Sequence, residues 1–130
     1  MSEIELINPP GTEGIYASFK FSQAVVARGR VDVAGQVGLG QDMQVPDDIA
    51  AQARNAFENL KGVLAAAGSS LAEVTQLTIY LTDIGDSRNV NEVFSEFFPE
   101  RYPARTVVQV VALVLPQLKI EVQASDVVGD

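Results

Sequence analysis

Apolar and polar residues alternate along several short segments of the chain, and this alternation predicts strands. Thr75–Thr82 alternates strictly and places three large aliphatic side chains on one face, which is typical of a strand buried on one side. Lys119–Val127 alternates in the same way. Ser22–Ala27 and Arg30–Gln36 are rich in Val and Ala, and the two residues between them suit a tight turn, so we expect a hairpin there. A short edge strand, followed by a loop, is expected within residues 1–20.

Two other segments carry apolar residues at steps of three and four, which is the spacing of an amphipathic helix. The first helix is expected over Asp47–Ala67, because Pro46 and two acidic residues suit a helix N-terminus and Gly68 suits a C-terminal cap. The second helix follows Asp86 and ends before Pro99.

The predicted order is β-β-β-α-β-α-β-β without a repeat or linker, so we expect one α+β domain over residues 1–130. A five- to six-stranded, mainly antiparallel sheet would carry both helices on one face. Arg105–Leu115 is apolar at nearly every position, which is the pattern of a strand buried on both faces. Since no segment remains to cover the second face, we expect another copy of the chain to cover it.

The composition excludes several kinds of chemistry. The chain has no Cys and no His, so it has no thiolate nucleophile, no Ser-His triad and no sulfur or imidazole ligand, and we expect neither a metal nor a cofactor. Its net charge of −8 makes nucleic acid an unfavourable partner. It has no apolar run long enough to span a membrane, and its N-terminus is acidic, so a cytoplasmic protein is expected.

Two charged residues stand in apolar strands and are candidates for chemistry. Arg105 begins the most apolar segment, where its guanidinium is either half of a structural salt bridge or a clamp for a ligand carboxylate. Glu121 points away from its apolar neighbours. It is either an ordinary surface charge or, if an oligomer covers it, a buried carboxylate with a raised pKa that can serve as a general base.

Two other features have simpler interpretations. The glycines from Gly35 to Gly40 predict a loop that needs positive φ angles, with a small backbone anion site as the alternative. Asp47 and Asp48 are interpreted as the start of a helix.

Several short motifs together carry a family resemblance. They are Phe21-Ser22-Gln23-Ala24, Val33-Ala34-Gly35-Gln36, Gln52 with Asn59-Leu60, Val90-Asn91, Pro103-Ala104-Arg105-Thr106-Val107 and Ile120-Glu121. In this order they resemble the RidA/YjgF family, also called the L-PSP family, over nearly the whole chain. The resemblance implies a chorismate-mutase-like fold, a homotrimer with ligand clefts between subunits, and hydrolysis of enamines or 2-imino acids to 2-oxo (keto) acids and ammonia.

The resemblance also implies roles for individual residues. The arginine that binds the substrate carboxylate corresponds to Arg105, and the glutamate that activates water corresponds to Glu121. Gly35 and Val107 match positions whose backbone lines the cleft, and Asn91 matches an asparagine close to it. Four positions depart from the family: Phe21 and Phe94 replace tyrosines, Ala34 replaces a serine, and Val107 replaces a frequent cysteine. We therefore expect a drier pocket.

Other functions remain open at this stage. A trimer that binds or senses a small carboxylate without chemistry is favoured by the lost hydroxyls and opposed by the retained Glu121. The ribonuclease or translation-inhibitor activity attached to the family name is opposed by the negative charge and the missing His. The sequence does not bear on a holdase activity.

One geometric expectation concerns Arg105 and Glu121. The last two predicted strands are joined by few residues, so they are expected to pair as an antiparallel hairpin that sets Glu121 opposite Ala112. At about 3.3 Å per residue, Arg105 and Glu121 would then lie roughly 23 Å apart in one chain. A shared site would need Arg105 of one subunit and Glu121 of its neighbour.

Overall fold

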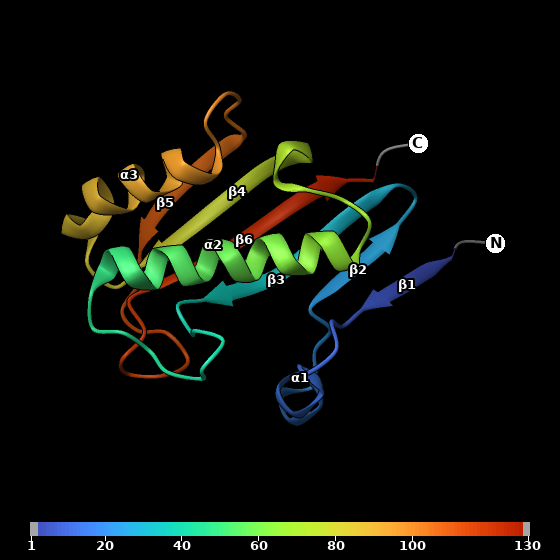
Figure 1. Ribbon diagram of the computed structural model, residues 1–130, viewed down its shortest axis with the longest axis horizontal. Coiled ribbons are helices and arrows are strands. Elements are labelled where there is room, and N and C mark those ends of the chain that lie inside the picture. The colour runs from blue at the N-terminus through green and yellow to red at the C-terminus, as the bar shows by residue number, and fades with distance from the viewer. Residues whose placement is uncertain (1–2, 129–130) are drawn as a thin grey trace.

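A computed structural model describes residues 3–128 and shows a six-stranded sheet with two long helices packed on one face (Figure 1). The elements are β1 (Ile4–Ile7), α1 (Glu13–Phe19), β2 (Ala24–Ala27), β3 (Arg30–Val37), α2 (Ile49–Ala66), the 3-10 turn η1 (Leu71–Glu73), β4 (Val74–Leu81), the 3-10 turn η2 (Ile84–Asp86), α3 (Ser87–Phe97), β5 (Ala104–Gln109) and β6 (Ile120–Val127). The strand order is β1-β2-β3-β6-β4-β5, and all neighbours are antiparallel except β4 and β5. The expected α+β fold is confirmed.

The N-terminal half contains the predicted hairpin and one helix that was not predicted. Strands β2 and β3 pair across Arg28 and Gly29, whose φ angles of 53° and 76° are those that a two-residue hairpin turn requires at both positions. The expected edge strand is β1. Residues 13–19, expected as loop, form α1, and the Glu13 carboxylate accepts the N–H of Gly11 just before it. Seven residues are too few to show a helical period.

Helix α2 lies across the sheet and supplies much of the core. It begins at Ile49, two residues later than expected, because the Asp48 carboxylate accepts the Ala51 N–H at 3.0 Å and so caps the helix. Gly68 follows the helix with a φ of 82°, as a C-terminal cap requires. None of the helices within residues 3–128 is both long enough and apolar enough to cross a membrane.

The core lies between the two long helices and one face of the sheet. Phe57 of α2 packs against Phe94 and Phe97 of α3, with ring centroids 6.1 and 5.4 Å apart, and this contact joins the two helices. The predicted inward face of β4 is fully buried beneath them. Burying one such side chain contributes about 1.5–3 kcal/mol to stability. The contact with α2 therefore holds α3 over β4 and β5, where the candidate site lies.

Two expectations for the C-terminal strands are wrong. The apolar segment 105–115 is not one strand: β5 ends at Gln109, because β4, the one strand that it pairs with among residues 3–128, ends at Leu81. Strand β5 pairs in parallel with β4 rather than in a hairpin with β6, and β6 lies between β3 and β4. The apolar side chains of Val111 and Val114 are exposed in the loop that follows, rather than buried on both faces of a strand.

The glycine run also has a different cause from the expected one. Gly35, Gly38 and Gly40 do not have positive φ angles. A Cβ at Gly35 would overlap the Glu121 carboxylate, and one at Gly38 would overlap the side chain of Gln52. These glycines are needed for close approach of side chains to the backbone.

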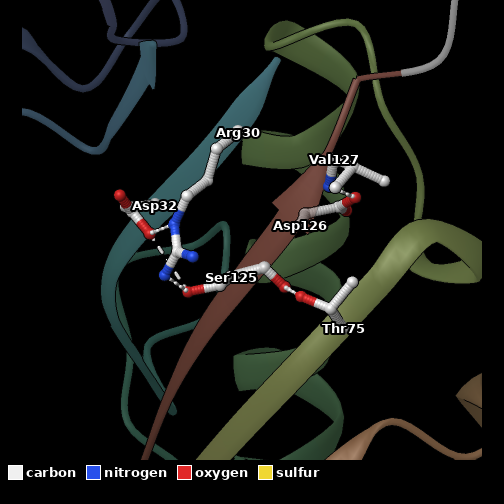
Figure 2. A network of polar contacts seen from close by, with 6 residues as sticks. All are labelled: Arg30, Asp32, Thr75, Ser125, Asp126 and Val127. Atoms are coloured by element: carbon white, nitrogen blue, oxygen red, sulfur yellow. Dashed lines mark hydrogen bonds and ion pairs between the residues drawn. The ribbon is translucent and has the colours of Figure 1, made fainter. Parts of the chain in front are cut away.

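A polar network ties three strands together on the face of the sheet opposite α2 (Figure 2). Arg30 of β3 pairs with Asp32 at 2.9 Å, and Arg30 and Asp32 both hydrogen-bond the Ser125 hydroxyl of β6. Thr75 of β4 donates to the Ser125 carbonyl at 3.3 Å. This exposed network lies on the sheet face that carries no helix in the described part of the chain.

Candidate functional site

An open groove of about 430 Å³ lies where β4 and β5 meet η2 and the first half of α3. Its lining combines an apolar floor with polar side chains on the rim, namely Ile79, Ile84, Ser87, Arg88, Val90, Asn91, Arg105 and Val107. The lining contains no acidic side chain. A groove with this lining suits a small, partly apolar anion.

Arg105 projects from β5 onto α3. Its Nη1 donates to Oδ1 of Asn91 at 2.8 Å, and its guanidinium carbon lies 4.6 Å from the centre of the Phe94 ring. The ring and the amide hold the planar group in place while its side chain stays exposed. Within residues 3–128 Arg105 forms no ion pair, so its charge is available to a ligand.

Glu121 occupies a different environment on β6. Its neighbours Ile120 and Val122 point into the core, so its own side chain points to the other face, where it is half-buried against the backbone at Gly35. Burial raises the pKa of Glu121 above its ordinary value. A β-bulge in β3 between Val33 and Gln36 shapes the backbone at this point. A half-buried carboxyl with a raised pKa suits proton transfer.

The predicted site residues therefore fall into two groups on opposite faces of the sheet. Arg105, Asn91 and Val107 line the groove on the helix side, and Glu121 lies with Gly35 on the open side. Arg105 pairs with Leu77 of β4, and Glu121 pairs with Tyr80 of the same strand. The two residues are therefore two strand spacings apart across the sheet and three residues apart along it, which gives a separation of roughly 14 Å. The expected separation of roughly 23 Å is wrong because it assumed a hairpin.

The other two predicted residues are Ala34, which lies in β3, and Phe21, which lies before β2. Ala34 precedes Gly35 in the bulge, and its N–H donates to the Gln23 carbonyl at 2.8 Å. Phe21 lies between α1 and β2 with 36% of its surface exposed, and it does not line the groove. One chain thus does not bring Phe21 or Ala34 to Arg105.

Five groove residues were not anticipated as site residues from the sequence: Ile79, Ile84, Ser87, Arg88 and Val90. A signal for two of them was present, because Ser87 and Arg88 precede Asn91 by four and three positions on the same helix, and residues at these spacings share a face. Once Asn91 was placed near the cleft, the helical period was sufficient to add them. Within residues 3–128 no cluster of three or more acidic side chains is suited to hold a metal ion.

Comparisons with known proteins identify relatives of this chain. A family model described as "Endoribonuclease L-PSP" matches residues 12–128. The protein of Escherichia coli named "Putative reactive intermediate deaminase TdcF" is 34% identical over 125 residues, which cover 93% of this chain and 92% of that protein. The human 2-iminobutanoate/2-iminopropanoate deaminase is 33% identical over 128 residues, covering 97% and 89%. A solved structure of E. coli TdcF with bound serine superposes with a TM-score of 0.79 at 34% identity, covering 84% of this chain and 88% of that one.

Proposed function

Because the chain belongs to the RidA/YjgF family, also described as endoribonuclease L-PSP, we propose that it is a hydrolytic deaminase. Its substrates would be reactive enamines and 2-imino acids, and its products 2-oxo acids and ammonia. The observation that carries this proposal is the Arg105 guanidinium, which is held over Phe94 without an ion pair within residues 3–128, at the edge of a groove with an apolar floor. Relatives named as deaminases and a relative that binds serine support it.

Arg105 is the proposed anchor for the substrate carboxylate. Asn91 accepts from Nη1, and the remaining guanidinium donors make no hydrogen bond within the described chain. A planar guanidinium can present two of these donors side by side to the two oxygens of a carboxylate. Val107 and Val90 in the floor of the groove would contact the aliphatic part of the ligand.

Glu121 is the proposed general base. Its ionised carboxylate would take a proton from water as the water oxygen adds to the C=N carbon, and would return that proton to the imine nitrogen, which gives a carbinolamine. The carboxylate would then take the hydroxyl proton of the carbinolamine and pass it to the amino group as the carbon–nitrogen bond breaks, which releases ammonia and leaves the carbonyl of the 2-oxo acid. A raised pKa brings the Glu121 carboxyl closer to neutrality, where one group can both accept and return a proton. Hydrolysis by this route needs neither a metal nor a covalent nucleophile.

A complete site is proposed to need two subunits. Arg105 and Glu121 lie on opposite faces of one sheet, so a small ligand that touches both must contact Arg105 of one chain and Glu121 of another. A head-to-tail homotrimer would repeat this contact three times, and the open sheet face would lie inside the assembly. Phe21 and Ala34 would reach the ligand from the Glu121 side.

The proposal is tested by measuring release of ammonia and 2-oxo acid from imines generated in situ by an amino-acid oxidase. We expect catalysed release from the imines of alanine and 2-aminobutanoate, and loss of that release in Glu121→Gln. The exposed variant Lys61→Ala on α2 serves as the charge-changing control. Tight binding of 2-oxobutanoate without any accelerated imine hydrolysis would instead support a binding or sensing trimer, for which the apolar residues at Phe21, Ala34 and Val107 provide the argument.

A further inference from the structure

The groove contains a second guanidinium that the proposed reaction does not use. Arg88 lies in the first turn of α3 and lines the same groove as Arg105, which approaches from β5. Arg88 is exposed and forms no ion pair within residues 3–128. One carboxylate anchor is enough for a simple 2-imino acid, so Arg88 calls for a separate explanation.

The charge of the groove is opposite to that of the protein. The chain as a whole carries a net charge of −8, yet the groove is lined by two arginines and no acidic side chain. The acidic residues that flank the lining positions in sequence, Asp83, Asp86 and Glu92, do not line it. Asp83 instead accepts the Gly85 N–H at 2.9 Å, and within residues 3–128 Glu92 forms no ion pair with Arg88. Two unpaired like charges facing one small groove repel each other, and a ligand with two anionic groups would relieve that repulsion.

The positions of the two arginines also suit a ligand with anionic groups at both ends. Arg105 is held by Asn91, and Arg88 lies one helical turn before Asn91 on the same face of α3. The apolar side chains of Ile79 and Val107, which pair across β4 and β5, line the same groove. The Ser87 hydroxyl on the rim adds a further hydrogen-bond donor beside Arg88.

We propose that Arg88 is a specificity-determining residue that binds a second carboxylate, so that the preferred substrate is a 2-imino dicarboxylate. Imines of this class are formed from amino acids with an acidic side chain. Arg105 binds the carboxylate next to the imine carbon, Arg88 binds the carboxylate at the end of the side chain, and the methylene groups lie on the apolar floor. This assignment rests on the proposed deaminase function for its catalytic part, while the binding preference stands on the groove alone.

The experiment compares two substrates across matched variants. Imines of aspartate or glutamate and of 2-aminobutanoate are generated in situ by oxidases, and the ratio of their kcat/KM values is measured for the wild type, Arg88→Ala, Arg88→Lys and Lys61→Ala. We expect the wild type to prefer the dicarboxylate. Arg88→Ala should lower the dicarboxylate-to-monocarboxylate ratio by about tenfold or more, since a charge-assisted hydrogen bond is lost. Arg88→Lys should retain part of the preference, and Lys61→Ala all of it.

A binding measurement separates this inference from the proposed function. Affinities for 2-oxoglutarate and 2-oxobutanoate are measured by calorimetry with the same variants. An Arg88-dependent preference for 2-oxoglutarate without imine hydrolysis would overturn the deaminase and leave the dicarboxylate groove standing. Hydrolysis of monocarboxylate imines with a ratio unchanged in Arg88→Ala would overturn the role of Arg88. Dissociation of the oligomer in both Arg88 variants would also overturn it, because Arg88 would then be a subunit contact.

Discussion

Arg105 and Glu121 project from opposite faces of the same sheet. Arg105 contacts Asn91 and Phe94 on the helix side, whereas Glu121 lies against Gly35 on the side without helices in the described chain. The sheet itself separates the two side chains, so side-chain motion within one chain cannot bring both to one small ligand. The relationship predicts how variants of the two residues behave when they are combined.

Complementation between two inactive variants tests whether the site is shared. Arg105→Ala and Glu121→Ala chains, each inactive alone, should recover activity when they are unfolded together and reassembled. Counting oriented contacts in a head-to-tail ring, every mixed trimer regains one intact site out of three. Ammonia release from the mixture checks this. Mixed trimers that form but show no activity would contradict a shared site.

Substitution of Arg105 tests the carboxylate anchor directly. Arg105→Ala should lower kcat/KM by about a hundredfold or more, because two charge-assisted hydrogen bonds are lost. Arg105→Lys should also be strongly impaired, because lysine lacks the planar pair of donors. The free energy of unfolding should fall by no more than about 1 kcal/mol, the contribution of the contact with Phe94. A large loss of stability, or dissociation of the oligomer, would assign Arg105 a structural role instead.

The pH dependence of the reaction tests the role of Glu121. Burial raises the pKa of Glu121, and a general base must be ionised to act, so kcat/KM should rise with pH through a limb that lies above the range of an ordinary glutamate. Glu121→Gln should lose both this limb and most of the activity. If the limb persisted in a Glu121→Gln enzyme with measurable activity, another group would be the base.

Two glycine substitutions distinguish an effect on the position of the Glu121 carboxylate from an effect on the stability of the fold. A Cβ in Gly35→Ala would overlap the Glu121 carboxylate and displace it, and we expect activity to fall by about a hundredfold. Gly62→Ala, inside α2 with nothing near the added methyl group, should raise the free energy of unfolding by about 0.5–1 kcal/mol and leave activity unchanged. Full activity in Gly35→Ala would show that the position of the Glu121 carboxylate is not critical.

A buried carboxyl at the end of β6 predicts pH-dependent stability. Asp126 is fully buried, and its Oδ2 has no hydrogen-bond partner in the described structure. Burial raises the pKa of Asp126, although the Ser69 hydroxyl and the Val127 N–H donate to its other oxygen and Arg101 also favours the ionised form. Since the folded state favours the protonated form, the stability from this group is present below the unfolded pKa and is lost as pH rises through the folded one.

Replacing Asp126 by asparagine should therefore change the pH profile of stability. Urea unfolding of Asp126→Asn should give a free energy that exceeds that of the wild type increasingly as pH rises above about 4, where an unfolded aspartate ionises. Glu58→Gln, on the exposed side of α2, removes the same charge without a buried group and is the control. A constant difference between wild type and Asp126→Asn across pH would contradict the assignment.

Local rules were sufficient to predict the elements whose cause lies within a few neighbouring residues. The hairpin at Arg28-Gly29 follows from a turn that requires two positive φ angles, and α2 follows from one apolar stripe with a cap at each end. The same rules correctly put Glu121 on the face opposite Ile120 and Val122, because side chains alternate along any strand.

Only the tertiary structure decided which strands are neighbours when no tight turn joins them. The loop from Val110 to Lys119 could return as a hairpin or pass around the end of β4 to its other edge. No local pattern distinguishes the two, because pairing depends on which edges remain open once β4, α3 and β5 have packed. Because β5 pairs with β4, it ends at Gln109, and its pairing determines the distance between Arg105 and Glu121. The same pairing places Arg105 at the groove that Arg88 also lines. The sequence alone determined which residues carry charge and which face of a strand they occupy, whereas long-range packing determined which of them meet.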